Sequence, residues 1–480
     1  YKRQVKSFEM SPVRALLWFS FVLLIHAGFS PLSGHSQEQV SSGDFARITD
    51  ETIVLPDPSH GATRGVVIDS SKVIDYKSIF VPELYHLVRN GALAVDALRR
   101  VAYTWRLDDA ASARNVELDT ASGPQQGQVL KRGQLYGAYQ QLVNSYEGNE
   151  LAKRVLWNVK SNWWSTGAID MQFSIVHFRE NQPRRVLGAK FQRIYPAAVG
   201  EPPNNKQLYR EVIAIEHPAF IAGYSLLSFR FLGESEDIVW ISSPINSKVR
   251  RVTGSNRADP ILTLPLSLDD MLSWSGKVER VEVSTIEELV TMLPFPQMEF
   301  GSLVRQPDGC FHVDLNTSPR RFGQGAWNYQ SKRFNAAADW APSEVVFVPR
   351  NVVRLEFKSL DPYSQYGRQI LYVDQASMLP AIKIVYDRSG TYYKAIFSAF
   401  GLAVTADKKR KEPYISMSLV YDSKNSAQLG MSFSKIRYCD SEQPDLQLAD
   451  LSPGAMLAEQ GVSPAEELDQ ESAELNKEQV

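Results

Sequence analysis

The side chains that could do chemistry in this 480-residue chain are few and mostly isolated. Asp269 and Asp270 form the best pair of carboxylates, and such pairs can serve general acid and base catalysis. They follow Ser267 at a predicted helix start, where acidic residues favour the helix dipole. Capping is therefore the better interpretation. His177 ends the apolar face of a predicted strand, which is typical of a hydrogen-bonded structural histidine.

Arg250 and Arg251 end a predicted strand directly after a turn. Guanidinium groups at the rim of a sheet can bind an anionic head group. A plain surface position is the commoner role of such a pair, so both interpretations stay open.

No catalytic or metal-binding motif occurs along the sequence. It contains no G-x-S-x-G elbow, H-E-x-x-H helix, Walker loop, EF-hand loop or C-x-x-C pair. We therefore expect a protein that is not an enzyme and that needs no metal or cofactor. A hydrolase in which Asp269 and His177 meet in one cleft is the less favoured alternative. A formal net charge of -2 supplies no field for nucleic acid, so no nucleic-acid partner is expected.

The chain has two cysteines, Cys310 and Cys439. In an oxidising compartment they could pair across a long loop. Two free buried thiols are slightly favoured, and the sequence leaves the choice open.

Residues 1–36 resemble a signal peptide, with Met10 as the expected start. Arg14 precedes the apolar run 15–25, and small residues such as Gly34 and Ser36 follow it. A charged, then apolar, then small-residue order is typical of a cleaved export signal. We expect an exported, periplasmic protein, and a location peripheral to the outer membrane is a further option that stays open.

The remaining chain divides by composition into four parts. Residues 37–80 are polar and predict an extended N-terminal arm, and residues 81–164 predict a helical segment. Residues 165–440 alternate apolar and polar side chains, which predicts strands, and the short gaps between these strands favour antiparallel pairing. Residues 441–480 are acidic and predict a disordered tail.

A curved antiparallel sheet covered by a few helices would leave an apolar concavity, although such faces are often simply core. We predict that strand residues of this face bind a hydrophobic ligand. They are Met171, Phe173, Ile175, Met417, Leu419, Met431 and Phe433.

Several stretches resemble the family of domains of unknown function numbered 1329, whose members are described as outer-membrane lipoprotein-sorting-like proteins. The residues that carry the resemblance are 239–240, 248–252, 267–270, 348–352, 361–374, 379–380 and 385–390. The chain departs from the family pattern at 242–246, where relatives commonly have a Tyr-Pro-Gly-Gln turn.

This resemblance implies a mainly β (α+β) fold, in which a large curved antiparallel sheet forms a half-open β-barrel covered by a few helices, as in lipoprotein carriers. It also implies a periplasmic carrier for a lipid, a lipoprotein acyl chain or another hydrophobic compound, working with an envelope exporter or outer-membrane partner. The alternative is a structural subunit of such a complex without its own ligand.

Overall fold

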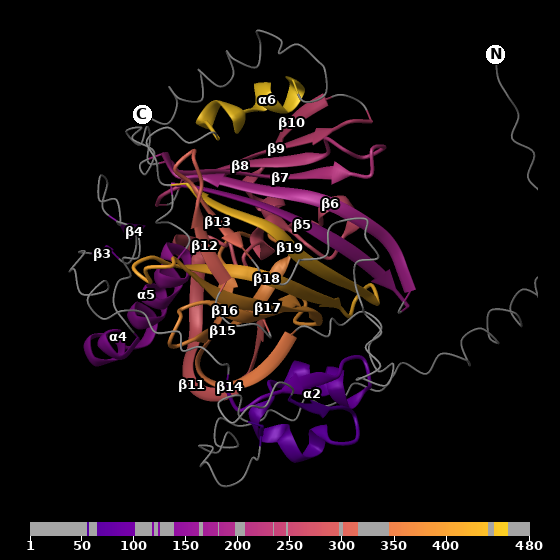
Figure 1. The fold of residues 1–480 in the computed structure, drawn as a ribbon, viewed down its shortest axis with the longest axis vertical. Coiled ribbons are helices and arrows are strands. Elements are labelled where there is room, and N and C mark those ends of the chain that lie inside the picture. Colours follow the sequence, from indigo (N-terminus) through magenta and orange to yellow (C-terminus); the bar gives the residue numbers. More distant parts are fainter. Residues whose placement is uncertain are drawn as a thin grey trace, which may run out of the picture. The chain divides into compact units, whose positions relative to one another are not determined.

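Seventeen strands of the described residues form one large sheet, mostly antiparallel (Figure 1). The computed structural model describes residues 55–56, 65–100, 118–119, 123–124, 139–162, 167–180, 182–196, 207–233, 235–245, 248–296, 301–314, 345–439 and 446–458. All of them belong to one compact unit, Phe45–Val480. The predicted signal peptide, 1–36, lies outside the described residues.

The central part of the sheet is a long antiparallel meander. In spatial order it runs β10 (Lys248–Val252), β9 (Ile238–Ser243), β8 (Ser225–Phe231), β7 (Gln207–His217), β6 (Gln182–Ile194), β5 (Ala168–Arg179), β19 (Ala427–Cys439), β18 (Lys411–Asp422), β17 (Tyr392–Val404), β16 (Pro380–Asp387), β15 (Tyr366–Asp374), β14 (Val345–Ser359) and β11 (Val281–Pro296). The predicted fold class, a mainly β protein with a curved, barrel-like antiparallel sheet and few helices, is confirmed.

A short hairpin closes part of this sheet. Its strands are β12 (Gly301–Arg305) and β13 (Phe311–Asp314). The first pairs in parallel with the end of β17, and the second pairs with the end of β19. A disulfide between Cys310 and Cys439 joins this hairpin to β19, so the free thiols that we slightly favoured are wrong. The strand pairing brings together two cysteines 129 residues apart, which spacing alone could not predict.

The remaining helices and short strands lie outside the meander. They are the helices α2 (Pro82–Arg89), α4 (Tyr139–Ser145), α5 (Gly148–Ser161) and α6 (Pro453–Ala458), the 3-10 helices η2 (Val73–Ile79) and η10 (Leu448–Asp450), and the short strands β1 (Val66–Ile68), β2 (Val95–Ala97), β3 (Leu118–Asp119) and β4 (Gly123–Pro124). No helix in the described ranges is long and apolar enough to span a membrane.

Three of the predicted segments differ from the structure. Residues 65–80 are not an extended arm, because β1 pairs with β2 and η2 buries Val73 and Ile79. The segment 81–164 is only partly helical, since β2 pairs in parallel with β14. Residues 446–458 of the predicted disordered tail are ordered on β9 and β10, where Leu451 and Met456 are buried. The acidic composition of the whole tail concealed these few apolar residues.

The connection between β10 and β11 does not form a strand. Residues 253–280, here called the plug, contain four short 3-10 helices, η5 (Gly254–Ala258), η6 (Ile261–Thr263), η7 (Leu268–Asp270) and η8 (Val278–Arg280). Among the described strands β10 pairs with β9 and β11 pairs with β14, and no ladder joins β10 to β11. The plug packs on one face of the meander, called the inner face, through the contacts described next.

Candidate functional site

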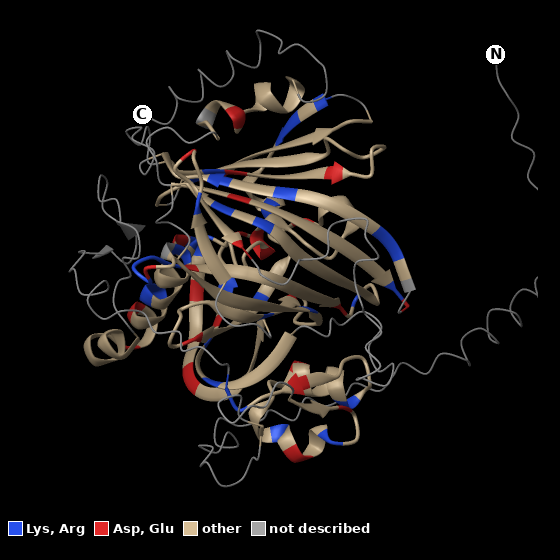
Figure 2. Ribbon diagram, in the orientation of Figure 1, with Lys and Arg blue, Asp and Glu red and all other residues tan. Residues whose placement is uncertain are grey.

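Charged residues occur at several positions within the strands of the sheet (Figure 2), and some of them are buried. Arg193 on β6 and Glu211 on β7 are directly paired in the ladder, so their side chains share one face. Both are almost fully buried. Isolated charges would be very costly there, so their partners decide whether the arrangement is stable.

The first cluster joins the plug to strands β6 and β7. Arg193 and Arg257 both contact the carboxylate of Glu211, each with a nitrogen–oxygen distance of 2.6 Å. Arg257, from η5 of the plug, also donates to Asp269 at 2.9 Å. Glu211 is therefore shared between a cation of the wall and a cation of the plug.

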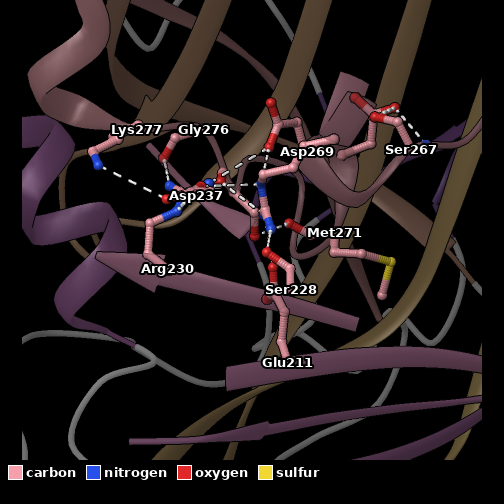
Figure 3. Close-up of polar contacts among 12 residues, drawn as sticks. Glu211, Ser228, Arg230, Asp237, Ser267, Asp269, Met271, Gly276 and Lys277 are labelled. Atoms are coloured by element: carbon pink, nitrogen blue, oxygen red, sulfur yellow. Dashed lines mark hydrogen bonds and ion pairs between the residues drawn. The ribbon is translucent and has the colours of Figure 1, made fainter. Parts of the chain in front are cut away.

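A second cluster lies around the plug carbonyl of Gly276 (Figure 3). This oxygen accepts hydrogen bonds from Arg230 on β8, at 2.9 Å, and from Lys160 at the end of α5, at 2.7 Å. Arg230 also forms an ion pair of 2.6 Å with Asp237. The plug is thus attached to the wall by backbone acceptors as well as by carboxylates.

A third cluster surrounds Asp270 on the other side of the plug. Its carboxylate lies 2.8 Å from Lys383 on β16 and 2.6 Å from Lys394 on β17, and it accepts a hydrogen bond from the hydroxyl of Tyr366 on β15. It also accepts from the backbone N–H and the hydroxyl of Ser267. The predicted capping by Asp270 is confirmed, and the two lysines are what the sequence did not reveal.

The pKa values follow from burial and from these partners. Burial would raise the pKa of Glu211, but Arg193 and Arg257 outweigh it and hold that pKa at about 2. Burial would also raise the pKa of Asp270. The charges of Lys383 and Lys394 outweigh that effect, so the pKa of Asp270 lies below its ordinary value. Burial lowers the pKa of Lys394, and that of Lys160 falls well below its usual range for the same reason.

This arrangement is suited to holding the plug in place. The carboxylates of Glu211 and Asp270 are buried and already paired with cations. No described contact joins Asp269 to His177, so the predicted alternative of a shared cleft has no support in the described residues. The same residues contain no group of three or more His, Cys, Asp or Glu side chains placed to hold a metal ion.

The ladder divides the seven predicted wall residues between two faces. Met171, Phe173, Ile175, Met431 and Phe433 lie on the inner face, because β5 and β19 pair Phe173 with Phe433 and Ile175 with Met431, and because β6 pairs Phe191, two residues from Arg193, with Met171. The rings of Phe173 and Phe433 stack 4.9 Å apart.

Met417 and Leu419 lie on the opposite face, which corrects the single wall predicted from the sequence. Ser418 is the residue paired with Met431, so its neighbours on β18 point the other way. Ser418 is buried and hydrogen-bonded to Ser398. Successive side chains of β18 therefore point to two faces that are both buried, and not to one buried and one solvent-exposed face.

Arg250 and Arg251 are also on opposite faces, as neighbours in a strand must be. Arg251 lines an open cavity of about 730 Å³ with Asp237, Ile238, Val252 and Gly254, and Arg250 does not. A smaller cavity of about 60 Å³ next to it reaches the Arg230 and Lys277 side chains. The two arginines therefore do not line this cavity together.

Comparison with other proteins identifies the chain at the level of its family. It belongs to the DUF1329 family, proteins of unknown function, whose profile matches residues 72–455. We found no curated protein with a matching sequence.

Three solved structures are similar over most of their own length. A domain from Vibrio parahaemolyticus described as that of an outer membrane lipoprotein-sorting protein is 13% identical with a TM-score of 0.43, covering 65% of this chain and 100% of that one. A DUF1329 family protein from Desulfovibrio piger is 15% identical with a TM-score of 0.39, covering 66% and 97%. A LolA superfamily protein from Nitrosomonas europaea is 13% identical with a TM-score of 0.36, covering 63% and 97%.

Removal of the Asp270 charge tests the third cluster. Asp270→Asn should lower the free energy of unfolding by about 3–5 kcal/mol, because Lys383 and Lys394 lose their buried carboxylate. Glu282→Gln is the control, since Glu282 and Lys358 form an exposed pair worth about 0–1 kcal/mol. Urea unfolding curves measure both. Equal, small losses for the two variants would show that Asp270 does not anchor the plug.

Acidification tests the first cluster. A carboxyl group whose pKa is lowered on folding contributes stability above its ordinary pKa and loses it as the pH falls towards the folded value. For Glu211 this window extends from 4.5 to about 2 and corresponds to about 3 kcal/mol. Urea unfolding at pH 7, 4 and 3 should show the loss in the parent, and a smaller one in Glu211→Gln. A parent protein equally stable at pH 3 and pH 7 would contradict this contribution of Glu211 to stability.

Proposed function

We propose that this DUF1329 protein is a non-catalytic periplasmic binding protein that carries a lipid, an acyl chain or another hydrophobic compound on the inner face of its sheet. One observation carries the proposal. The plug lays a run of buried apolar side chains on that face without joining the ladder, and these are Leu264, Leu266, Leu268, Met271, Leu272 and Trp274. A hydrophobic ligand could replace such contacts without breaking a strand.

The apolar ligand would gain roughly 0.8 kcal/mol for each methylene group that it buries. The inner-face residues Met171, Phe173, Ile175, Met431 and Phe433 would contact it once the plug moves. Methionine suits this role because its flexible thioether adapts to ligands of irregular shape. In this proposal the plug occupies the place of the ligand whenever no ligand is bound.

The plug backbone supports displacement. Of the eight non-glycine residues with positive φ in the described part of the chain, four lie in the plug, namely Leu262, Thr263, Leu272 and Ser273. Such conformations cost of order 1–3 kcal/mol each and persist only where surrounding contacts impose them. The ion pairs of Glu211 and Asp270 would supply those contacts, so that the closed plug stores strain that opening releases.

A structural subunit without a ligand is the second candidate. The burial of both faces of β18 favours it, since an entirely self-filled sheet needs no cargo. In that role the protein would dock to an envelope exporter or an outer-membrane complex, and the plug would stay in place.

Two methionines on neighbouring strands provide a matched test. Met431 on the inner face and Met417 on the opposite face are both buried. Met431→Gln should weaken binding of an uncharged fluorescent lipid about tenfold, because the ligand would lose the adaptable thioether contact and meet a polar amide in its place. Met417→Gln should leave the dissociation constant unchanged.

The measurement is a fluorescence titration, with circular dichroism to verify that both variants fold. Native mass spectrometry of the protein recovered from cells would identify any bound cargo. If the parent binds no lipid, or if both variants bind it equally well, the carrier proposal is wrong and the structural role remains.

A further inference from the structure

Both ends of the plug line the same two adjoining cavities. Thr253 and Gly254, at its start, line the open cavity of about 730 Å³. Gly254 also lines the smaller cavity of about 60 Å³, together with Gly276, Lys277 and Arg280 from the end of the plug. A group bound in these cavities would therefore contact the plug both where it leaves the sheet and where it returns to it.

The connection between β14 and β15 fixes both ends of the plug. The hydroxyl of Ser255 donates to Asp361 at 2.6 Å, and the backbone N–H of Leu360 donates to the carbonyl of Arg280 at 2.9 Å. Ser255, Arg280 and Asp361 all line the smaller cavity. Its lining is therefore held together by contacts between segments that are far apart in the sequence.

The charged side chains that line the two cavities carry an excess of one positive charge. Four carboxylates line them, against five Lys or Arg side chains. These cations are Arg230, Arg251, Arg257, Lys277 and Arg280. The neighbouring buried charges leave the excess unchanged, because Glu211 is matched by Arg193 and Glu279 by Lys160.

Two of these cations, Lys277 and Arg251, are weakly paired. The ammonium group of Lys277 donates to the carbonyl of Ser235 and lies 3.8 Å from Asp237, a carboxylate that Arg230 already binds at 2.6 Å (Figure 3). Burial lowers the pKa of Lys277, so Asp237 does not offset the loss of water. Arg251 is exposed and makes no ion pair with any residue that the structure describes.

We propose that these cavities bind the anionic head group, a phosphate or a carboxylate, of an amphiphilic cargo. Arg251 and Lys277 would hold its oxygen atoms, since guanidinium and ammonium groups form strong charge-assisted hydrogen bonds to oxyanions. One bound negative charge would balance the charges that line the cavities. The head-group site rests on the carrier function proposed above and narrows its cargo to an anionic amphiphile.

The smaller cavity also reaches the apolar side of the plug. Trp274 lines it and packs against Phe357 of β14, with ring centroids 5.7 Å apart. Trp274 is the last of the buried apolar side chains of the plug that a hydrophobic ligand would replace. An oxyanion in the cavity would therefore lie at one end of the space that its own acyl chain fills.

An oxyanion in the cavities would also compete with the plug for its cations. Arg257 donates to Asp269 at 2.9 Å, and Arg230 donates to the carbonyl of Gly276 at 2.9 Å. Both arginines line the smaller cavity, so an anion that draws them away from the plug weakens two of its anchors. Head-group binding and release of the plug are therefore coupled, as the entry of an acyl chain requires.

The experiment compares two glutamine variants of the protein as recovered from cells. The cavity variant carries Arg251→Gln and Lys277→Gln. The control variant carries Arg250→Gln, next to Arg251 but outside the cavity lining, and Lys424→Gln, an exposed lysine paired with Asp387 at 3.6 Å. Circular dichroism verifies folding. Arg251→Gln alone, at an exposed position, keeps the test available should the double variant not fold.

Three probes separate the head group from the chain, namely dodecyl phosphate, dodecanol and inorganic phosphate. Displacement of an uncharged fluorescent lipid measures the two amphiphiles below their aggregation limits, and isothermal calorimetry measures inorganic phosphate. The parent and the control variant should bind dodecyl phosphate about tenfold more tightly than dodecanol, because charged groups strengthen hydrogen bonds by that order. The cavity variant should lose this preference and still bind dodecanol as the parent does.

The outcomes separate this site from the carrier function. A parent that binds dodecanol and dodecyl phosphate equally well would overturn the head-group site and leave the carrier function standing, as would a preference that the cavity variant retains. A parent that binds neither amphiphile would contradict the carrier function. Inorganic phosphate bound by the parent and the control variant, but not by the cavity variant, would then still support the oxyanion site by itself.

Discussion

The structure depends on two charged groups of the plug that bind opposite walls of one sheet. Arg257 binds Glu211 on β7, and Asp270 binds Lys383 and Lys394 on β16 and β17. Both groups belong to the plug, so the connection between β10 and β11 ties together halves of the sheet that, among the described strands, the ladder joins only through β5 and β19. Charges buried in this way are stable only as a complete set.

These ion pairs hold the plug firmly when all of them are formed. The plug nevertheless covers the apolar inner face without pairing with any strand of the sheet. In the proposed function, buried leucines and Trp274 of the plug fill the place where an acyl chain would lie, and the left-handed residues of the plug make that packing strained. The same contacts can therefore exclude water in the free protein and give way to a ligand of greater apolar area.

The sequence predicted what depends on local pattern and missed what depends on pairing across the sheet. Alternation of Met171, Phe173 and Ile175 correctly indicated a strand, and Ser267 with Asp270 correctly indicated a cap. Sequence distance hid the lysines that meet Asp270, more than 110 residues away. It also hid the register that sends Met417 and Met431 to opposite faces. Isolated charges inside apolar strands, such as Lys383 and Lys394, were the one available signal of a buried network.

Hydrogen–deuterium exchange of the plug tests the central claim most directly. The protein is compared with and without a saturating, uncharged lipid, and the amides of residues 253–280 are followed beside those of β5 and β19. Displacement of the plug predicts faster exchange throughout 253–280 with lipid bound, while the two strands stay protected. Bound lipid with unchanged or slower exchange in the plug would contradict the account, because the ligand would then lie somewhere other than the inner face.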